Sequence, residues 1–244
     1  IHKGLLKRTV GHVKAVNDAT LSVRAGETLG IVGESGSGKT TLALAMMRLI
    51  SSEGGITFER QDTRSWSTRE MRAARKDMQI VFQDPFGSLS PRMTAEQIIA
   101  EGLGVHGTDG ARTSRDMVSD IMVEVGLDPD TMHRYPHELS GGERQRVGIA
   151  AALVCEPKIV IADEPLSMLD VSIRADILDL IKNLAKDRQF SCVYVSHDLS
   201  ILGNVADRVL IMYLGQAVEL GNAKDVIQSP AHPYTRALIS SVPI

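Results

Sequence analysis

Short apolar runs bounded by turn-forming residues recur along the chain, a pattern that predicts buried β-strands. Between residues 14 and 32, still shorter β-like runs flank a turn at Ala25-Gly26-Glu27, which predicts a small antiparallel β part at the front. The clearer runs predict strands at residues 28–32, 56–58, 78–82, 158–162, 191–195, 208–213 and 216–220.

Segments whose apolar residues fall at helical spacing separate these runs. They predict helices at residues 40–50, 67–76, 94–126 (broken by a polar, glycine-rich loop at 104–110), 140–154 and 173–187. Because strands alternate with helices, we expect an α/β fold with a mainly parallel sheet. The middle of the chain is helical only, so we expect an inserted helical subdomain at residues 85–156.

Length and charge narrow the class of protein. The chain has 244 residues, enough for one large α/β domain with a subdomain. A net charge of −3 and a pI of about 6.2 give no reason to expect a nucleic-acid surface. No apolar run approaches the ~18 to 20 residues that span a bilayer. Cys155 and Cys192 sit in apolar contexts and are expected to be buried free thiols.

The segment Gly33-Glu34-Ser35-Gly36-Ser37-Gly38-Lys39-Thr40 fits the phosphate-loop pattern at every fixed position. It lies between a predicted strand and a predicted helix, where glycines let backbone N–H groups approach an anion. Lys39 should reach the β- and γ-phosphates of a nucleotide, and the Thr40 hydroxyl should hold Mg²⁺. Thr41 follows in the same helix start. The segment predicts nucleotide binding.

A second element delivers carboxylates. Ile159-Val160-Ile161-Ala162-Asp163-Glu164 has the form of a Walker B strand, in which four apolar residues precede an acidic pair. Asp163 would hold Mg²⁺ indirectly, and Glu164 would orient or polarise the attacking water. Apolar residues followed by Asp-Glu are common at ordinary strand ends. The interpretation of this segment as a Walker B strand therefore depends on the phosphate loop in the same chain.

Far downstream of the phosphate loop, Leu139-Ser140-Gly141-Gly142-Glu143 opens a predicted helix, with Ser140 as a good N-cap. Together with the phosphate loop and in this order, the segment resembles the signature of ATP-binding-cassette (ABC) ATPases. The resemblance covers essentially the whole chain. It implies a phosphate-loop NTPase (RecA-like) core, binding of ATP and Mg²⁺, and ATP hydrolysis.

The resemblance also assigns further residues. Gln83 matches the glutamine that senses Mg²⁺ and contacts the membrane partner, Asp170 matches the D-loop, and His197 matches the switch histidine near the γ-phosphate. In such ATPases, Ser140, Gly141 and Gly142 act on the nucleotide of a second cassette. The resemblance therefore implies a head-to-tail dimer with two ATP molecules at its interface.

Several segments narrow the resemblance to importers. Ser229-Pro230-Ala231-His232-Pro233-Tyr234-Thr235 is similar to the tail element of oligopeptide/dipeptide (Opp/Dpp) importer ATPases. Lys3-Gly4-Leu5-Leu6-Lys7-Arg8-Thr9-Val10 resembles the second half of fused Yej-type peptide and glutathione importer ATPases. Because the chain begins at Ile1 and not Met, we expect it to be a piece of such a longer protein. The division expected is a core with a β subdomain (1–84 and 157–225), the helical subdomain (85–156) and a tail (226–244).

Some positions depart from the family pattern. No Phe, Tyr or Trp precedes Phe58, so the aromatic residue that usually stacks on adenine is expected upstream of this chain, and we expect the isolated chain to bind adenine less well. Ala151 stands where relatives carry Arg, and Leu166 and Met168 replace smaller or β-branched residues. We expect these three to place apolar bulk near the dimer interface.

The function expected is ATP hydrolysis that powers import of peptides or related small solutes. The partners implied are two transmembrane permease subunits, a second ATPase domain (identical or paired) and, indirectly, a periplasmic solute-binding protein. The place implied is the cytoplasmic face of the bacterial inner membrane. The alternative is an ABC-type ATPase of a soluble enzyme complex, of the carbon–phosphorus lyase accessory type, whose tail is similar.

Overall fold

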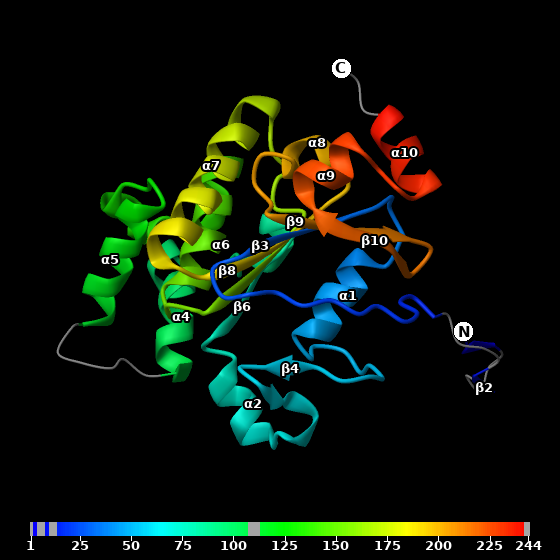
Figure 1. The fold of residues 1–244 in the computed structure, drawn as a ribbon. Coiled ribbons are helices and arrows are strands. Elements are labelled where there is room, and N and C mark those ends of the chain that lie inside the picture. Colours follow the sequence, from blue (N-terminus) through cyan, green and yellow to red (C-terminus); the bar gives the residue numbers. More distant parts are fainter. Residues whose placement is uncertain (1, 4–7, 10–13, 107–112, 242–244) are drawn as a thin grey trace.

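The fold centres on one six-stranded sheet with the strand order β10-β9-β3-β8-β7-β6 (Figure 1). The computed structural model describes residues 2–3, 8–9, 14–106 and 113–241. The sheet strands are β3 (Thr28–Val32), β6 (Met78–Val81), β7 (Ile159–Asp163), β8 (Ser191–Ser196), β9 (Arg208–Tyr213) and β10 (Gln216–Asn222). Two small antiparallel pairs lie outside the sheet: β1 (His2–Lys3) with β2 (Arg8–Thr9), and β4 (Thr57–Phe58) with β5 (Gln61–Asp62).

The helices fill the intervals between strands. They are α1 (Lys39–Met46), α2 (Thr68–Ala74), α3 (Pro85–Ser88), α4 (Ala95–His106), α5 (Ser114–Glu124), α6 (Gly141–Leu153), α7 (Val171–Arg188), α8 (Leu199–Leu202), α9 (Ala223–Gln228) and α10 (Pro233–Ser240). Three short 3₁₀ helices are η1 (Thr63–Ser65), η2 (Pro129–His133) and η3 (Pro136–Glu138). No helix in the described part of the chain is both long and apolar enough to cross a membrane.

Parallel pairing brings five strand ends to one edge of the sheet. β3 runs parallel to β8 and β9, β8 to β7, and β7 to β6, whereas β10 is antiparallel to β9. The loops that follow β3, β6, β7 and β8 therefore open at the same edge. In open α/β sheets this carboxyl edge is where ligands bind.

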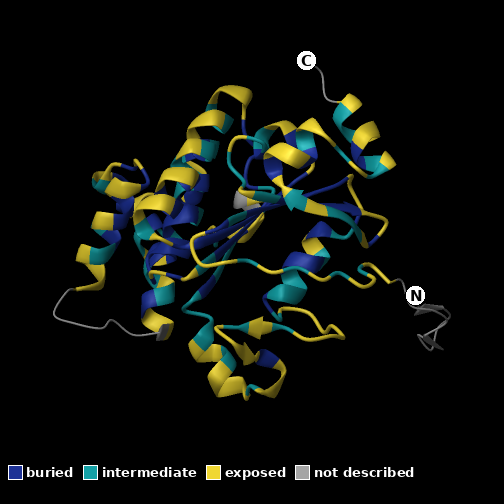
Figure 2. Ribbon diagram, in the orientation of Figure 1, coloured by how far each residue is buried: buried dark blue, intermediate teal, exposed yellow. Residues whose placement is uncertain are grey.

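Neighbouring residues of each strand point to opposite sides of the sheet, and the inner strands are buried on both faces because helices cover both sides. Ile31 and Ile161 pack with α1 on one face, and Val32 and Val160 pack in the larger core with α6 and α7 on the other. The inner strands β3, β7, β8 and β9 are accordingly mostly dark blue in Figure 2, whereas the edge strand β10 is intermediate to exposed and the outer helix faces are yellow. Both cysteines are buried and free, as predicted.

The elements between β6 and β7 are α3 to α6 with η2 and η3, all helical. The helices α4, α5 and α6 pack against one another around Ile99, Val118 and Val147, each at most 1% exposed. The division into core, helical subdomain (85–156) and tail (226–244) remains a proposal. Residues 107–110 of the predicted glycine-rich loop, and most of the Lys3–Val10 stretch, lie outside the described residues.

Two predictions about residues 14–50 are wrong. Residues 14–24 form no strand, although Ala19, Leu21 and Val23 alternate as predicted, because they pack beside α1 without a described strand to pair with. The predicted helix 40–50 ends early, at Met46. Arg48 there takes a left-handed backbone (φ 50°), and its guanidinium donates to the Thr63 carbonyl.

Candidate functional site

The phosphate loop joins β3 to α1 and is packed tightly enough to require glycine at two positions. A Cβ on Gly33 would lie 2.2 Å from the Met212 carbonyl oxygen, and one on Gly38 would lie 2.3 Å from that of Ala15. Gly38 also has φ 100°, which side chains other than glycine's rarely allow, and it caps α1. Within the loop, Glu34, Ser35 and Gly36 are exposed.

Ser37 connects the loop to its surroundings. Its carbonyl accepts a hydrogen bond from Gly215 N–H at 2.9 Å, in the turn between β9 and β10. Its hydroxyl is buried and has no hydrogen-bond partner among the described residues. A buried hydroxyl without a partner fits a site that receives a polar ligand.

Lys39 is buried directly under the loop. Its ammonium donates to the carbonyls of Gly33 (2.8 Å) and Glu34 (3.0 Å) and lies 3.7 Å from Glu164 Oε1. The side chain is 4% exposed. A buried cation beside an anion-binding loop is the arrangement that phosphate binding requires.

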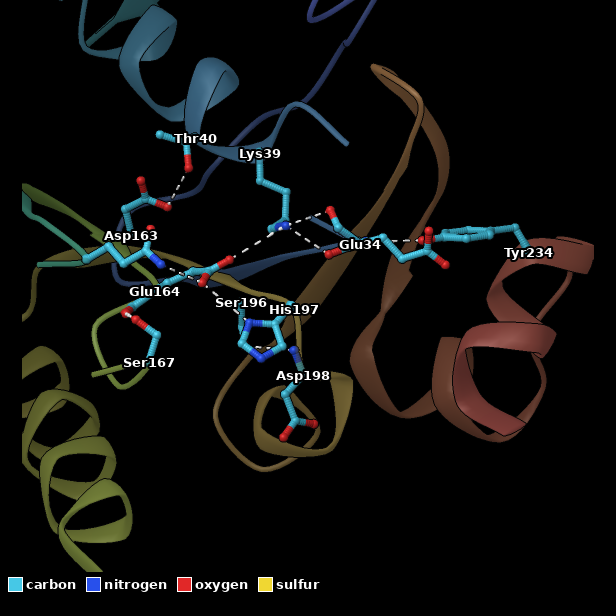
Figure 3. Close-up of polar contacts among 12 residues, drawn as sticks. Glu34, Lys39, Thr40, Asp163, Glu164, Ser167, Ser196, His197, Asp198 and Tyr234 are labelled. Atoms are coloured by element: carbon cyan, nitrogen blue, oxygen red, sulfur yellow. Dashed lines mark hydrogen bonds and ion pairs between the residues drawn. The ribbon is translucent and has the colours of Figure 1, made fainter. Parts of the chain in front are cut away.

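Glu164 is contacted by three side chains that follow other strands of the sheet, and Figure 3 shows two of them, Lys39 and His197, pointing toward it. Its Oε2 accepts from Gln83 Nε2 at 3.2 Å and lies 3.4 Å from His197 Nδ1, while its Oε1 faces Lys39. We call Lys39, Gln83, Glu164 and His197 the Glu164 cluster. The cluster forms because β3, β8, β7 and β6 are neighbours whose ends meet at one edge.

The backbone of Glu164 is held in an unusual conformation. Its φ is 45°, in the left-handed region that residues other than glycine seldom adopt. Glu164 N–H donates to the Val195 carbonyl at 2.9 Å, and the Ser167 hydroxyl donates to the Glu164 carbonyl at 3.1 Å. Such strain persists where surrounding contacts determine it, and it is concentrated at functional sites.

Asp163 forms a pair with Thr40 beside the cluster. Thr40 Oγ1 donates to Asp163 Oδ1 at 3.2 Å, and Asp163 is 3% exposed. Burial and the nearby Glu164 charge raise the pKa of Asp163, although the Thr40 hydrogen bond and Lys39 oppose this. A cation bound here would favour the ionised carboxylate, and hydroxyl and carboxylate oxygens are ligands that suit Mg²⁺.

The signature segment, Ser140-Gly141-Gly142, forms hydrogen bonds within the helix that it begins. Ser140 Oγ accepts from Glu143 N–H at 3.3 Å, and Ser140 N–H donates back to Glu143 Oε2 at 2.8 Å. Ser140 holds the pKa of Glu143 below its usual value. Among the described residues, no hydrogen bond or ion pair joins this segment to the Glu164 cluster. Asp170, exposed at the start of α7, is likewise outside it.

The positions that depart from the family pattern prove to be in different environments. Leu166 is 5% exposed and belongs to the core, so it adds no apolar bulk to a surface, contrary to prediction. Ala151 lines a groove with Phe82 and Val105, eleven residues along the chain from Ser140. Met168 is 57% exposed, as an interface residue could be.

Sequence reasoning missed one contact of the site. The hydroxyl of Tyr234, on α10, accepts a hydrogen bond from Glu34 N–H in the phosphate loop at 3.2 Å. The His232-Pro233-Tyr234 element resembles that of an importer group, but no local pattern connects it to the loop. A separation of 200 residues hides the contact from any periodicity argument.

Comparison with known families assigns the chain to a family. The family described as ABC transporter matches residues 16–167. The chain belongs to the ABC transporter family. A further family, described as the C-terminal region of oligopeptide/dipeptide transporters, matches residues 218–244 of this ABC ATPase. Both resemblances inferred from the sequence are confirmed.

Relatives and solved structures agree with this assignment. The oligopeptide transport ATP-binding protein AppF of Bacillus subtilis is 47% identical, over 100% of the chain and 75% of its own length. The peptidoglycan transport ATP-binding protein YejF of Agrobacterium fabrum is 47% identical over 99% of the chain, which spans 44% of YejF. The dimeric post-hydrolysis structure of the ATP-binding cassette MJ0796, bound to ADP and Pi, has a TM-score of 0.77 at 28% identity, covering 86% of this chain and 90% of that one. The predicted α/β phosphate-loop NTPase fold and the ATPase class are confirmed.

Proposed function

We propose that this ABC ATPase is the ATP-binding and ATP-hydrolysing subunit of an importer for peptides or related small solutes. The observation that carries the hydrolytic role is the convergence of Lys39, Gln83 and His197 on the Glu164 carboxylate. Glu164 orients and polarises the attacking water. His197 stabilises charge near the γ-phosphate, and Lys39 moves from the loop carbonyls to the β- and γ-phosphates of ATP.

Mg²⁺ fits the same edge of the sheet. Thr40 and Asp163 would hold the ion. Gln83, which donates a hydrogen bond to the neighbouring Glu164, would sense the ion. When bound, the ion neutralises charge on the triphosphate. The loop residues from Gly33 to Thr41 provide the remaining contacts to the nucleotide.

A second cassette is needed to complete each site. Ser140, Gly141, Gly142 and Asp170 do not reach the Glu164 cluster of their own chain, so we propose that they act on the nucleotide of a partner. The helix that Ser140 opens presents its positive end to the γ-phosphate there. The dimer holds two such sites, in two chains or in two halves of one longer protein.

A groove between β6, α4 and α6 fits a permease partner. It has a volume of about 440 Å³, and Leu49 (42%), Phe82 (44%) and Val105 (49%) are exposed around it. Apolar groups exposed together on a surface mark interaction sites. Phe82 directly precedes Gln83, so a movement of Phe82 in the groove would be passed to the Glu164 cluster through the neighbouring residue. We propose that a segment of each of two permease subunits docks here, at the cytoplasmic face of the bacterial inner membrane.

The class of solute rests on the tail. The match of residues 218–244 to the oligopeptide/dipeptide transporter C-terminal region supports peptides, supplied by a periplasmic solute-binding protein. The name of AppF points to the same class.

Co-purification tests this proposal. The protein is tagged in its native cell, the membranes are solubilised, and the partners are identified by mass spectrometry with and without a Val105→Glu substitution in the groove. We expect two multispanning permeases with the unchanged protein and their loss with the variant. A soluble enzyme assembly without permeases would overturn the transport role and leave the ATPase assignment standing.

A further inference from the structure

The C-terminal segment runs from β10 through α9 to α10 and is tied back to the sheet by Glu219. The two carboxylate oxygens of Glu219 accept the N–H groups of Ala231 (2.9 Å) and His232 (3.0 Å). The loop that leads into α10 is therefore fixed relative to β10.

Tyr234 is oriented from two sides. His232 caps α10 by accepting Tyr234 N–H at its Nδ1 (3.2 Å). The Tyr234 ring lies against the ring of Tyr213, with centroids 4.3 Å apart and planes tilted by 35°. Tyr213 ends β9 directly after Met212, whose carbonyl crowds Gly33 of the phosphate loop. The same strand end thus positions both the ring and the loop.

The Tyr234 hydroxyl reaches one peptide group of the phosphate loop (Figure 3). It accepts from Glu34 N–H at 3.2 Å, while the carbonyl of the same peptide group, Gly33 C=O, accepts from Lys39 Nζ at 2.8 Å. One peptide is therefore held at its N–H by the tail and at its C=O by the phosphate-binding lysine. Hydrogen bonds linked through a peptide group polarise one another.

We infer that Tyr234 is a positioning residue for ATP binding: by holding Glu34 N–H it fixes the loop peptide against which Lys39 is aligned. Within the described part of the chain, no hydrogen bond or ion pair joins Tyr234 to the Glu164 cluster, so Tyr234 acts through Glu34 on the alignment of Lys39. The inference deepens the proposed function and rests on it. Burial raises the pKa of Tyr234, although the bond from Glu34 opposes this, so the hydroxyl stays protonated at neutral pH.

The expected consequence is a change in affinity rather than in chemistry. Without the hydroxyl, the loop samples more conformations before ATP binds, and ordering it then costs part of the binding energy. Once ATP is bound, its phosphates hold the loop and Lys39 themselves. We therefore expect the Kd and KM for ATP to rise while kcat at saturating ATP stays near that of the unchanged protein.

The test compares Tyr234→Phe with Tyr213→Phe in the full chain. Both substitutions keep the ring pair and remove one hydroxyl, and the Tyr213 hydroxyl has no hydrogen bond to another described residue. We expect Tyr234→Phe to weaken MgATP and MgADP binding about three- to tenfold, the loss typical of one neutral hydrogen bond, with kcat within about twofold. Tyr213→Phe should bind both nucleotides within about twofold of the unchanged protein.

Thermal melting separates positioning from a structural role. A tail that merely stabilises the fold would lower the Tm and the active fraction of Tyr234→Phe without changing the Kd of the folded molecules. An unchanged Kd for Tyr234→Phe, or an equal rise in both variants, would overturn the inference. Absence of ATP binding in the unchanged protein would instead overturn the proposed function.

Discussion

The Glu164 cluster and the signature segment satisfy their polar groups in opposite ways. The cluster joins four elements far apart in sequence, so its side chains are partners only because the strands are neighbours in the sheet. In the signature segment, Ser140 bonds to Glu143, three residues later, and would do so in any helix with this start. The cluster therefore forms within one chain, whereas the signature segment bonds to its own helix and acts on a second cassette only in the proposed dimer.

The largest effect should come from removing the cation of the cluster. Lys39→Ala leaves the loop carbonyls of Gly33 and Glu34 and the Glu164 carboxylate without their ammonium. We expect MgATP binding to be lost and hydrolysis to fall roughly 10³-fold or more, measured by nucleotide titration and phosphate release.

Lys182→Ala is the matched control for this change. Lys182 is exposed and donates to the Asn204 carbonyl (3.0 Å), away from the site, so binding and hydrolysis should be unchanged. Tight MgATP binding by Lys39→Ala would refute the assignment of the phosphate loop.

Glu164→Gln should separate binding from hydrolysis. The amide keeps the size of the side chain and can still bond to its neighbours, but it cannot act on water as the carboxylate does. We expect hydrolysis to fall roughly 10²- to 10³-fold while ATP binding persists, so that a closed, ATP-bound dimer accumulates in size-exclusion chromatography. Near-normal phosphate release would contradict the role of Glu164, and Glu53→Gln, on an exposed loop, serves as the control.

Ser140→Asp tests whether the signature segment acts on another cassette. Aspartate caps helices as well as serine, so folding should be preserved, but its charge would repel a γ-phosphate. We expect ATP-driven dimer formation and hydrolysis to fall about 100-fold, with ATP binding by the single chain unchanged. Ser67→Asp makes the same change in the matching cap of α2, opposite Glu70, and should have no effect on either.

Mixing two defective chains sharpens the comparison further. Lys39→Ala and Ser140→Asp chains together would form a dimer with one site defective twice and one site intact. Partial recovery of hydrolysis on mixing would show that the two regions meet between chains. If each chain completed its own site, the mixture would stay inactive.

The same contrast explains what could be predicted from the sequence. Strands such as Arg208–Tyr213 and the helix that Ser140 opens follow from local patterns, and the structure has them where expected. The edge at which Gln83, Glu164 and His197 gather also follows, because parallel strands share one carboxyl end. The resemblance to a known family supplied the roles of these residues, which no periodicity contains.

The failures are of the opposite kind. Residues 14–24 have a strand pattern but pair with no described strand, and burial of Leu166 depends on packing that its neighbours in sequence do not reveal. The bond between Tyr234 and Glu34 joins the tail to the loop only because β9 and β10 lie at the end of the same sheet. Contacts between distant segments require the fold, and local sequence carries no signal for them.

The smallest expected effect lies in the cap of the signature helix. The Ser140 hydroxyl and N–H lower the pKa of Glu143 from its usual 4.5, so the ionised form stabilises the folded state. That stabilisation is complete above pH 4.5 and is lost as the pH falls through the lowered pKa. Because Glu143 is partly solvated, Glu143→Gln should cost only about 0.5 kcal/mol at neutral pH, and the difference should vanish in acid, once the pH is below the lowered pKa.

Glu70→Gln in α2 provides the decisive comparison for this last change. The pKa of Glu70 is also lowered by hydrogen bonds from its N-cap serine, so melting curves of both variants should approach the unchanged protein in acid. Only Glu143→Gln should also weaken ATP-driven dimer formation, since in the proposed dimer only its cap faces a partner's nucleotide. If both variants dimerised like the unchanged protein, the Glu143 cap would be merely structural, and the link between the signature segment and the second cassette would rest on Ser140 and the glycines alone.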